Sequence, residues 1–235
     1  MSKFADIYGH EQIKEHLQNA IRLNKVSHAY IFNGPMGSGK KMTAGIFAET
    51  LQCERHGQEP CGTCHSCIQS ESGNQPDIIW VHHEKPGSIG VDDVREQVIG
   101  DMQIKPYSSR YKIYIIDEAE KLTQQAQNAL LKTIEEPPAY GIIILLTTNA
   151  DTFLQTILSR CVRLDFRPLR DTLVTQYLQE KYDLTDYECR FATAFAQGKI
   201  GRAVTIATSK EFAQLKEEVM HVIRYAKEMT TAEIM

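Results

Sequence analysis

Residues 34–40, which read Gly-Pro-Met-Gly-Ser-Gly-Lys, constrain the fold of this chain more than any other segment. They follow an apolar run at 29–33 and precede a stretch with helical periodicity. A G-x-x-x-x-G-K loop between a strand and a helix is typical of a phosphate-binding loop, whose backbone N–H groups surround phosphate oxygens. The helix N-terminus adds favourable partial charge, and the lysine reaches the β- and γ-phosphates. The residues predicted to contact a nucleotide here are Gly34, Gly37, Gly39 and Lys40.

The position after this motif departs from the pattern. A Ser or Thr normally follows the lysine, and its hydroxyl holds Mg²⁺. Lys41 stands there instead, and a cation cannot ligate a cation. Thr43 lies two residues on, roughly 200° around a helix, and is poorly placed to substitute. We expect weak or absent Mg²⁺-dependent hydrolysis, while nucleotide binding through the loop amides and Lys40 stays open.

Apolar runs alternate with helical patterns over the first two thirds of the chain. Their length and β-branched content favour strands at 29–33, 77–81, 112–116, 142–147 and 161–166. The third and fourth runs are almost continuously apolar, which is typical of parallel strands buried on both faces. A helical segment at 123–136 ends at Pro137-Pro138. The alternation predicts a three-layer α/β core with a parallel sheet.

Polar residues follow two of these predicted strands. Asp117-Glu118 closes the third strand and resembles a Walker B pair, in which Asp117 holds Mg²⁺ through water and Glu118 orients the attacking water. An ordinary charge pair at the start of a helix is the alternative. Thr148 follows the fourth strand and is a candidate sensor of the γ-phosphate, although a plain strand exit gives the same pattern.

Four of the six cysteines are closely spaced, at Cys53, Cys61, Cys64 and Cys67. Such spacing in a reducing compartment favours metal over disulfides. Four thiolates close a tetrahedron around Zn²⁺ at roughly 2.3 Å, which predicts a structural zinc site. His56 and His65 are substitute ligands, and a redox pair with buried thiols is the alternative reading.

Composition and the C-terminal third limit the remaining choices. The net charge of −4 argues against a globally basic protein that coats nucleic acid or anionic lipid. No apolar run reaches transmembrane length and no signal core is seen at the N-terminus, so we expect a cytoplasmic protein. Helical patterns at 171–180, 186–197, 201–208 and 211–229 predict a small helical domain after the core, and the last helix lacks a clear stop.

Together these motifs resemble the bacterial DNA polymerase III clamp-loader subunits of the AAA+ class. The resemblance spans about 34–161 and rests on GPMGSGK, the four-cysteine insert, YKIYIIDEAEKL, NALLKTIEEPP and TILSRC. It implies an AAA+ core at 1–167 with a zinc module at 53–67, a helical lid at 168–208, and the start of a truncated helical collar at 209–235. GKIGRA at 198–203 is similar to the sensor 2 segment of the lid, which marks Arg202.

Within this family the chain resembles the delta-prime type more than the gamma/tau motor type, because Lys40-Lys41 replaces an intact Lys-Ser/Thr pair and ESGNQPD follows at 71–77. The resemblance implies a non-hydrolysing stator in a five-membered ring with gamma/tau and delta subunits, which loads the sliding clamp onto primed DNA. Arg160 of the SRC motif is implied to act in trans, in the ATP site of a neighbouring gamma/tau subunit. An autonomous motor ATPase and a zinc-ribbon nucleic-acid binder are the competing interpretations.

Overall fold

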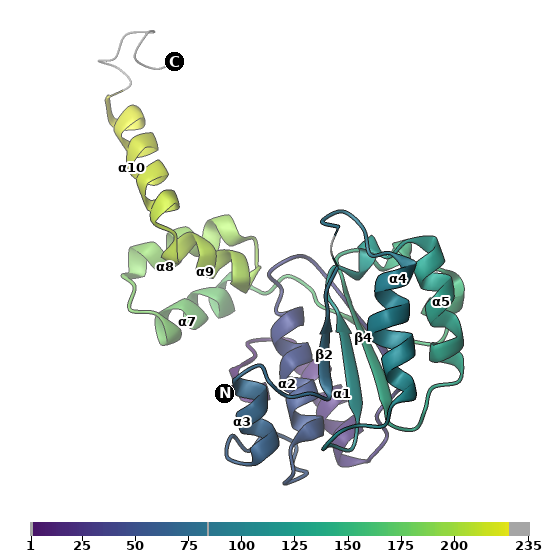
Figure 1. The fold of residues 1–235 in the computed structure, drawn as a ribbon. Coiled ribbons are helices and arrows are strands. Elements are labelled where there is room, and N and C mark those ends of the chain that lie inside the picture. Colours follow the sequence, from purple (N-terminus) through teal and green to yellow (C-terminus); the bar gives the residue numbers. More distant parts are fainter. Residues whose placement is uncertain (1, 84, 226–235) are drawn as a thin grey trace. The chain divides into compact units, whose positions relative to one another are not determined.

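The computed structural model describes residues 2–83 and 85–225. The chain divides into two compact units, Met1–Arg167 and Pro168–Met235. The first unit is a sheet covered by helices on both faces, and the second consists of helices (Figure 1).

All strands of the sheet are parallel, in the order β2-β3-β4-β1-β5. The five predicted strands are confirmed, each with ends within one residue of those expected. β3 and β4 are buried at every position, because helices cover both of their faces. The strands are β1 Ala29–Asn33, β2 Ile78–Val81, β3 Lys112–Ile116, β4 Gly141–Thr147 and β5 Val162–Asp165.

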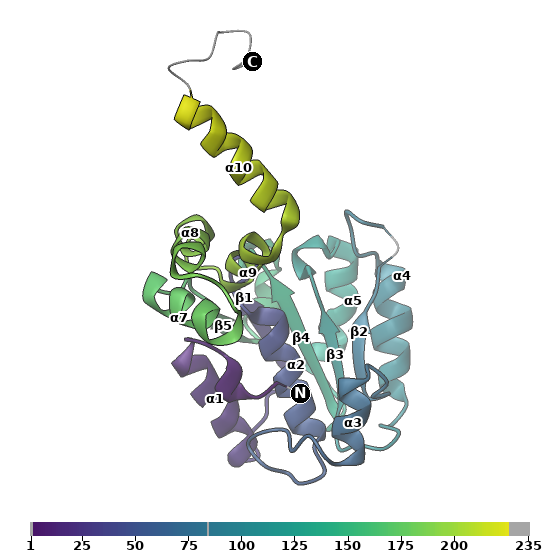
Figure 2. The same cartoon turned by 90° about the vertical axis from the view of Figure 1, so that its left-hand side faces the viewer.

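Two hydrophobic cores fill the spaces between the sheet and its helices. One core joins α1 and α2 to the sheet through side chains such as Leu17 and Phe47. The other joins α4 and α5 to the opposite face through Val94 and Leu130. Figures 1 and 2 show these helices on the two sides of the strands. The helices of this unit are α1 Glu11–Arg22, α2 Lys40–Gln52, α3 His65–Glu71, α4 Val91–Val94, α5 Gln124–Glu135 and α6 Gln155–Leu158. The three-layer α/β architecture is therefore confirmed.

Besides the short helices α3 and α6, one longer helical segment was not expected from the sequence. Between β2 and β3, α4 continues as a π-helix over Arg95–Gly100 and a 3₁₀ turn over Asp101–Gln103. Val94, Val98 and Met102 recur every four residues and are fully buried against the sheet. This spacing was the available sequence signal, since side chains four apart lie on one helical face.

The second unit consists of α7 Asp171–Lys181, α8 Asp186–Ala196, α9 Ile200–Thr208 and α10 Lys210–Tyr225. The bounds of the first three agree with the predicted helices to within one residue. The predicted end of the fourth helix, at 229, lies outside the described residues. A small core of Val174, Leu178, Cys189 and Ala192 holds α7 and α8 together. Across residues 2–83 and 85–225, no helix is long and apolar enough to cross a membrane.

Candidate nucleotide site and cysteine cluster

Three adjacent strands bring the predicted nucleotide-binding residues to one edge of the sheet. The loop at 34–40 follows β1, Asp117 and Glu118 follow β3, and Thr148 follows β4. β4 lies between β3 and β1, and all three run parallel. The carboxyl ends of these strands therefore meet at the position where open α/β sheets bind ligands.

The phosphate loop is held in shape by packing and by its own lysine. Gly39 caps α2 with φ 94°, in the left-handed region that favours glycine. A Cβ on Gly34 would collide with the backbone carbonyl of Phe166. The Lys40 ammonium donates to the carbonyls of Gly34 and Pro35, the latter at 2.9 Å. Burial lowers the pKa of Lys40, and the carboxylates of Glu120 and Asp117 oppose that shift.

Two polar groups of the loop region were not singled out by the sequence. Ser38 is only 7% exposed, and its hydroxyl has no hydrogen-bond partner among the described residues. Nε2 of His10 donates to the Ser38 carbonyl at 3.1 Å, and the His10 ring lies 4.8 Å from the Phe166 ring. Burial lowers the pKa of His10. Only the tertiary fold brings His10 to the loop, so no local sequence signal marked it.

Lys41 contacts one of the predicted metal-site carboxylates. Its ammonium lies 3.1 Å from Oδ2 of Asp117, and it stands 5.1 Å from the centre of the Trp80 ring. The Lys41 side chain is 68% exposed. The chain thus supplies its own cation to Asp117, the carboxylate expected to hold Mg²⁺ through water. This arrangement does not fit a metal ion at the same carboxylate, because an ammonium repels a divalent cation.

The neighbouring acidic side chains also have partners within the chain. Glu118 accepts a 2.7 Å contact from the ammonium of Lys121, and its own backbone is left-handed with φ 50°. Thr148 donates its hydroxyl to Glu120 at 2.6 Å. Burial favours a higher pKa for Glu120, but the hydrogen bonds that its carboxylate accepts from Thr148 keep its pKa below the usual value. The sequence analysis did not single out Glu120, which the structure places beside Thr148.

Arg160 lies far along the sheet from the loop. It precedes β5 and therefore stands at the amino-terminal edge, while the loop follows the carboxyl end of β1. Its guanidinium pairs with Glu135, at the end of α5, at 2.9 Å and donates to the Thr156 carbonyl at 3.0 Å. Arg202, on α9 of the second unit, is exposed. Arg160 therefore lies outside the loop site of the first unit, and Arg202 belongs to the second unit.

The four clustered cysteines converge between the end of α2 and the first turn of α3. The sulfurs of Cys53, Cys61, Cys64 and Cys67 all lie within 4.8 Å of one another. The Cys61 and Cys67 sulfurs are 3.9 Å apart, close to the roughly 3.8 Å edge of a tetrahedron with 2.3 Å metal–sulfur bonds. The cluster therefore has the size of a four-thiolate metal site.

Hydrogen bonds within the cluster favour the thiolate form that a metal requires. The backbone N–H groups of Cys64 and Cys67 donate to the sulfurs of Cys61 and Cys64, at 3.3 and 3.4 Å. The pKa of Cys61 is lowered to about 5, chiefly because the backbone N–H of Thr63 donates a hydrogen bond to its sulfur. Burial raises the pKa of Cys53 and of Cys67. The donor set fits a tetrahedral metal ion with soft ligands, such as Zn²⁺.

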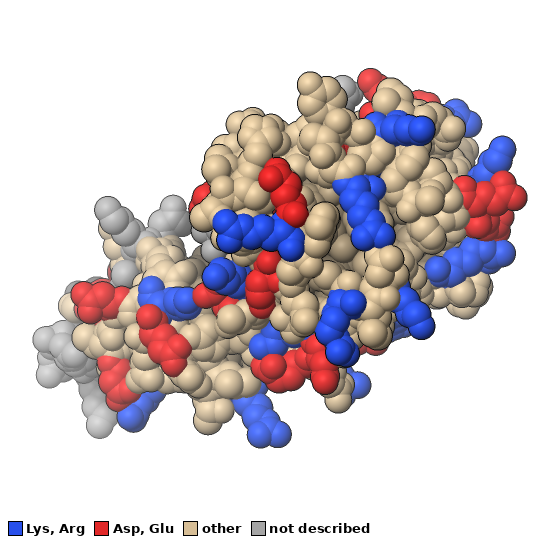
Figure 3. All heavy atoms as spheres, turned by 90° about the horizontal axis from the view of Figure 1, so that it is seen from below, with Lys and Arg blue, Asp and Glu red and all other residues tan. Residues whose placement is uncertain are grey.

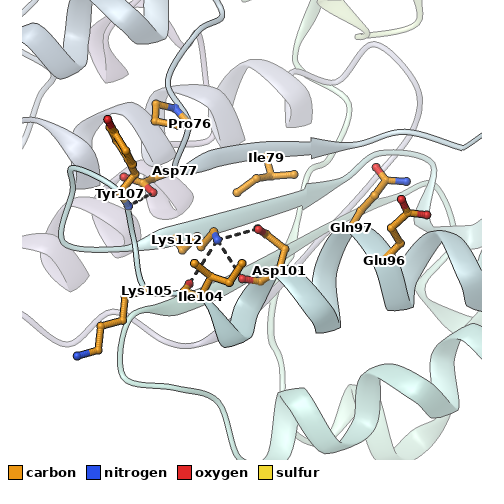
Figure 4. A pocket seen from close by; sticks show the side chains of 10 residues that line it. All are labelled: Pro76, Asp77, Ile79, Glu96, Gln97, Asp101, Ile104, Lys105, Tyr107 and Lys112. Carbon is orange, nitrogen blue, oxygen red and sulfur yellow. Dashed lines mark hydrogen bonds and ion pairs between the residues drawn. The ribbon is translucent and has the colours of Figure 1, made fainter.

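A separate hollow of about 490 Å³ lies beside the amino ends of β2 and β3 (Figure 4). Three of its charged groups, Asp77, Asp101 and Lys112, make internal contacts. Asp77 accepts three backbone N–H bonds from residues 107–109, and buried Lys112 pairs with Asp101 at 2.9 Å. Lys105 also lines the hollow, with its ammonium directed away from it (Figure 4). These contacts fix the loop before β3 and therefore contribute to positioning that strand.

Charges of both signs are interspersed on the molecular face in Figure 3. The Lys and Arg side chains on this face are separated from one another by uncharged or acidic residues and form no continuous basic surface among the described residues. This distribution agrees with the net charge of −4. It gives no support to a zinc-ribbon module that binds nucleic acid by charge alone.

The five-stranded parallel sheet with a phosphate loop between β1 and α2 defines a P-loop protein of the AAA+ type. A solved structure of RuvB from Thermotoga maritima, a Holliday junction branch migration motor, shares this fold with TM-score 0.55 at 16% identity, over 85% of this chain and 61% of that one. Residues 9–170 match the family described as DNA polymerase III, delta subunit, and the chain belongs to that family.

Relatives of both subunit types are similar to the chain. The tau/gamma subunit of DNA polymerase III from Haemophilus influenzae is 38% identical over 86% of this chain and 30% of its own length. The delta-prime subunit from Bacillus subtilis is 34% identical over 87% of this chain and 61% of its own length. A gamma subunit-related protein from Thermotoga maritima has TM-score 0.52 at 26% identity, over 79% of this chain and 58% of that one. The chain thus spans between 30% and 61% of these two curated relatives.

Proposed function

We propose that this chain acts as a delta-prime type stator of a bacterial clamp loader. The observation that carries the proposal is the ion pair between Lys41 and Asp117. In a motor subunit the equivalent positions would grip Mg²⁺, which hydrolysis of a nucleoside triphosphate requires. Here Lys41 stands at the position of the hydroxyl residue, and its ammonium pairs with the Asp117 carboxylate. The subunit accordingly has no Mg²⁺-dependent ATPase activity of its own.

Arg160 then serves the chemistry of a neighbouring gamma/tau subunit in trans. Its guanidinium is half-exposed and lies at the sheet edge opposite the chain's own loop, which supports a role outside that loop. A planar guanidinium bridges two phosphate oxygens and stabilises the charge of the transferring phosphoryl group. Glu135 and the Thr156 carbonyl orient the side chain in the free subunit.

The other assignments follow from the same proposal. Gamma/tau and delta subunits are its ring partners, and the sliding clamp and primed DNA are reached through the assembled loader in the cytoplasm. Residues 168–208 serve as the lid, which carries Arg202, and residues 209–235 begin a collar. The four cysteines hold one structural Zn²⁺, which stiffens the excursion between α2 and α3.

The decisive experiment combines the isolated chain with an assembled loader. The isolated chain is expected to show no Mg²⁺-dependent ATP turnover. In a loader built with gamma/tau and delta, Arg160→Ala is expected to slow hydrolysis at the site it serves by about 10³–10⁵-fold, the range for arginine fingers. Arg163→Ala is the matched control, because Arg163 pairs with Asp165 of its own strand. Equal rates in the Arg160→Ala and wild-type loaders would refute the role in trans.

A gamma/tau-like motor is the second candidate. The identity of 38% to a tau/gamma subunit, against 34% to a delta-prime subunit, favours it, as does the complete glycine pattern of the loop. The same assay separates the two candidates. Robust ATP turnover by the isolated chain, abolished by Lys40→Ala, would establish the motor and exclude the stator.

A further inference from the structure

The excursion at 54–60, which joins Cys53 to Cys61, has little regular structure of its own. It contains no helix or strand. Its one backbone–backbone hydrogen bond among the described residues runs from the His56 N–H to the Cys53 carbonyl, at 3.0 Å. Cys53 directly follows α2, so that helix fixes the first end of the excursion. The second end is held at Cys61, whose sulfur belongs to the cysteine cluster.

Glu59, close to this second end, contacts the N-terminal part of the chain. Its Oε2 accepts a hydrogen bond from the Phe4 N–H at 2.8 Å, and its Oε1 accepts one from Nε2 of Gln18 on α1 at 3.1 Å. Phe4 begins a 3₁₀ turn, Phe4–Asp6, and its side chain is buried in the core beside α1 and α2. The first N–H groups of a helical turn have no partner within it. Glu59 therefore supplies an acceptor that the N-terminal turn lacks.

The position of Glu59 depends on the cysteine cluster. Cys61 lies two residues further on, and the residue between them, Pro60, is buried and has a fixed φ. Metal binding orders the segments that supply its ligands. A metal ion held by Cys61 therefore also fixes the carboxylate of Glu59, whereas an excursion with a single backbone hydrogen bond cannot fix it alone.

We propose that metal binding at the cysteine cluster latches the N-terminal turn onto the core through Glu59. Glu59 is a positioning residue, because its two oxygens accept from Phe4 and Gln18. The effect ends within a few residues, since the Lys14 ammonium holds the Ile7 carbonyl at 2.9 Å and α1 packs on the sheet through its own apolar face. This inference rests on the proposed metal site and is independent of the choice between stator and motor.

Amide hydrogen exchange measures the latch in the full chain, with Zn²⁺ bound and after its removal by a chelator. Metal removal is expected to speed exchange of the Phe4 N–H by about 10- to 100-fold, the range for one charge-assisted hydrogen bond. The Ile13 N–H, which donates to the His10 carbonyl at 2.9 Å in α1, is expected to keep its rate. Unchanged exchange at Phe4 would overturn the proposal. An equal loss of protection at Ile13 would also contradict it, because the metal would then hold the whole unit.

Glu59→Ala separates the latch from the metal site. The variant is expected to keep about one equivalent of zinc, by the usual four-ligand count, while its Phe4 N–H exchanges as fast as in the metal-free wild type and no faster after chelation. Glu59→Gln keeps one acceptor oxygen and is expected to recover part of the protection. Glu54→Ala is the matched control, because Glu54 accepts from the Ser66 N–H at 3.2 Å near the cluster itself. Slow exchange of Phe4 in zinc-loaded Glu59→Ala would exclude Glu59 from the latch.

Zinc analysis of the same samples distinguishes the two ways in which the inference can fail. A chain that binds no zinc would overturn the metal site and the latch together. A zinc-loaded chain whose Phe4 N–H ignores chelation would overturn the latch alone. The stator function is tested separately, by Arg160→Ala in the assembled loader.

Discussion

Two regions of the first unit gather groups that attract cations, and they are neutralised in different ways. At the edge of the sheet, Asp117 and Glu118 are each paired with a lysine of the same chain, Lys41 and Lys121. In the cysteine cluster, the sulfurs receive hydrogen bonds from backbone N–H groups, and four of them converge within 4.8 Å. The first region carries its own cations, whereas the second is shaped to take one from solution.

This difference separates two kinds of dependence on metal. Ammonium groups on flexible stems screen carboxylates without ordering the surrounding chain, since exposed ion pairs contribute little. A four-thiolate site orders every segment that supplies a ligand, because binding free energy becomes folding free energy. We therefore expect metal removal to disrupt the segment at 53–71 and to leave the phosphate loop unchanged.

The largest expected effect comes from breaking the cysteine cluster. Structural zinc sites in peptides have apparent binding free energies of about 10–16 kcal/mol, which four thiolates share. Cys64→Ser removes one ligand and is expected to lower bound zinc from about one equivalent to almost none, by the usual four-ligand count. Elemental analysis of the purified protein measures the metal, and limited proteolysis is expected to cut between residues 53 and 71.

Cys189→Ala provides the control for this variant, because Cys189 is buried in the core of the second unit and is not one of the four clustered cysteines. It is expected to retain its zinc. If Cys64→Ser keeps a full equivalent of metal, the cluster does not hold it and the contrast between the two regions disappears.

A smaller effect tests whether packing alone shapes the phosphate loop. Gly34→Ala would drive a Cβ against the backbone of Phe166 and within 2.8 Å of the Phe166 Cβ. Overpacking of this kind destabilises by about 1–3 kcal/mol. Urea unfolding is the measurement, and Gly87→Ala, where no atom lies within 4 Å of the added Cβ, is the control. Equal stability of the two variants would show that the loop is not held by this close approach.

At the acidic edge of the sheet, the contribution of the Glu120–Thr148 hydrogen bond to the free energy of unfolding is expected to depend on pH. Because the folded-state pKa of Glu120 is lowered, its interaction with Thr148 stabilises the protein above about pH 4.3, the unfolded value, and is lost as pH falls through the lower folded value. Thr148→Val is expected to lower the unfolding free energy by at most about 1 kcal/mol near pH 6. The difference from wild type should vanish in strong acid.

Thr205→Val is the matched control for that measurement, because the Thr205 hydroxyl donates to a backbone carbonyl, that of Gly201. Its effect is expected to be independent of pH. A Thr148→Val difference that stays constant from pH 6 to pH 3 would mean that Glu120 does not titrate with that hydrogen bond.

The smallest expected effect concerns the ion pair that carries the proposed function. Lys41→Met keeps an apolar stem beside Trp80 and removes the ammonium from Asp117. The pair is largely exposed, so the unfolding free energy should change by about 0.5 kcal/mol or less. Urea unfolding checks this. A loss well above about 1 kcal/mol would mark the pair as a structural element of the loop rather than a substitute for a metal.

Local sequence patterns were sufficient to predict the three layers of the core, the phosphate loop and the cysteine cluster. The strands β1, β3 and β4 were predictable because their apolar runs are buried on both faces of a parallel sheet. The outer strands β2 and β5 are less buried and were indicated by their β-branched content. The glycine frame at 34–40 and the cysteine spacing are likewise local, since each motif's geometry is set within a few residues. The π-helical segment after α4 was missed, although its apolar spacing was visible.

Partnerships across the sheet were decided by the tertiary structure. The sequence indicated that Lys41 lacks a metal-binding hydroxyl, but only the adjacency of β3, β4 and β1 places its ammonium beside Asp117, 76 positions later. The same holds for Glu120 with Thr148 and for Arg160 with Glu135. Side chains on long, rotatable stems choose partners from whatever the strand order brings within reach. Strand order is fixed by non-local burial, which no short stretch of sequence contains.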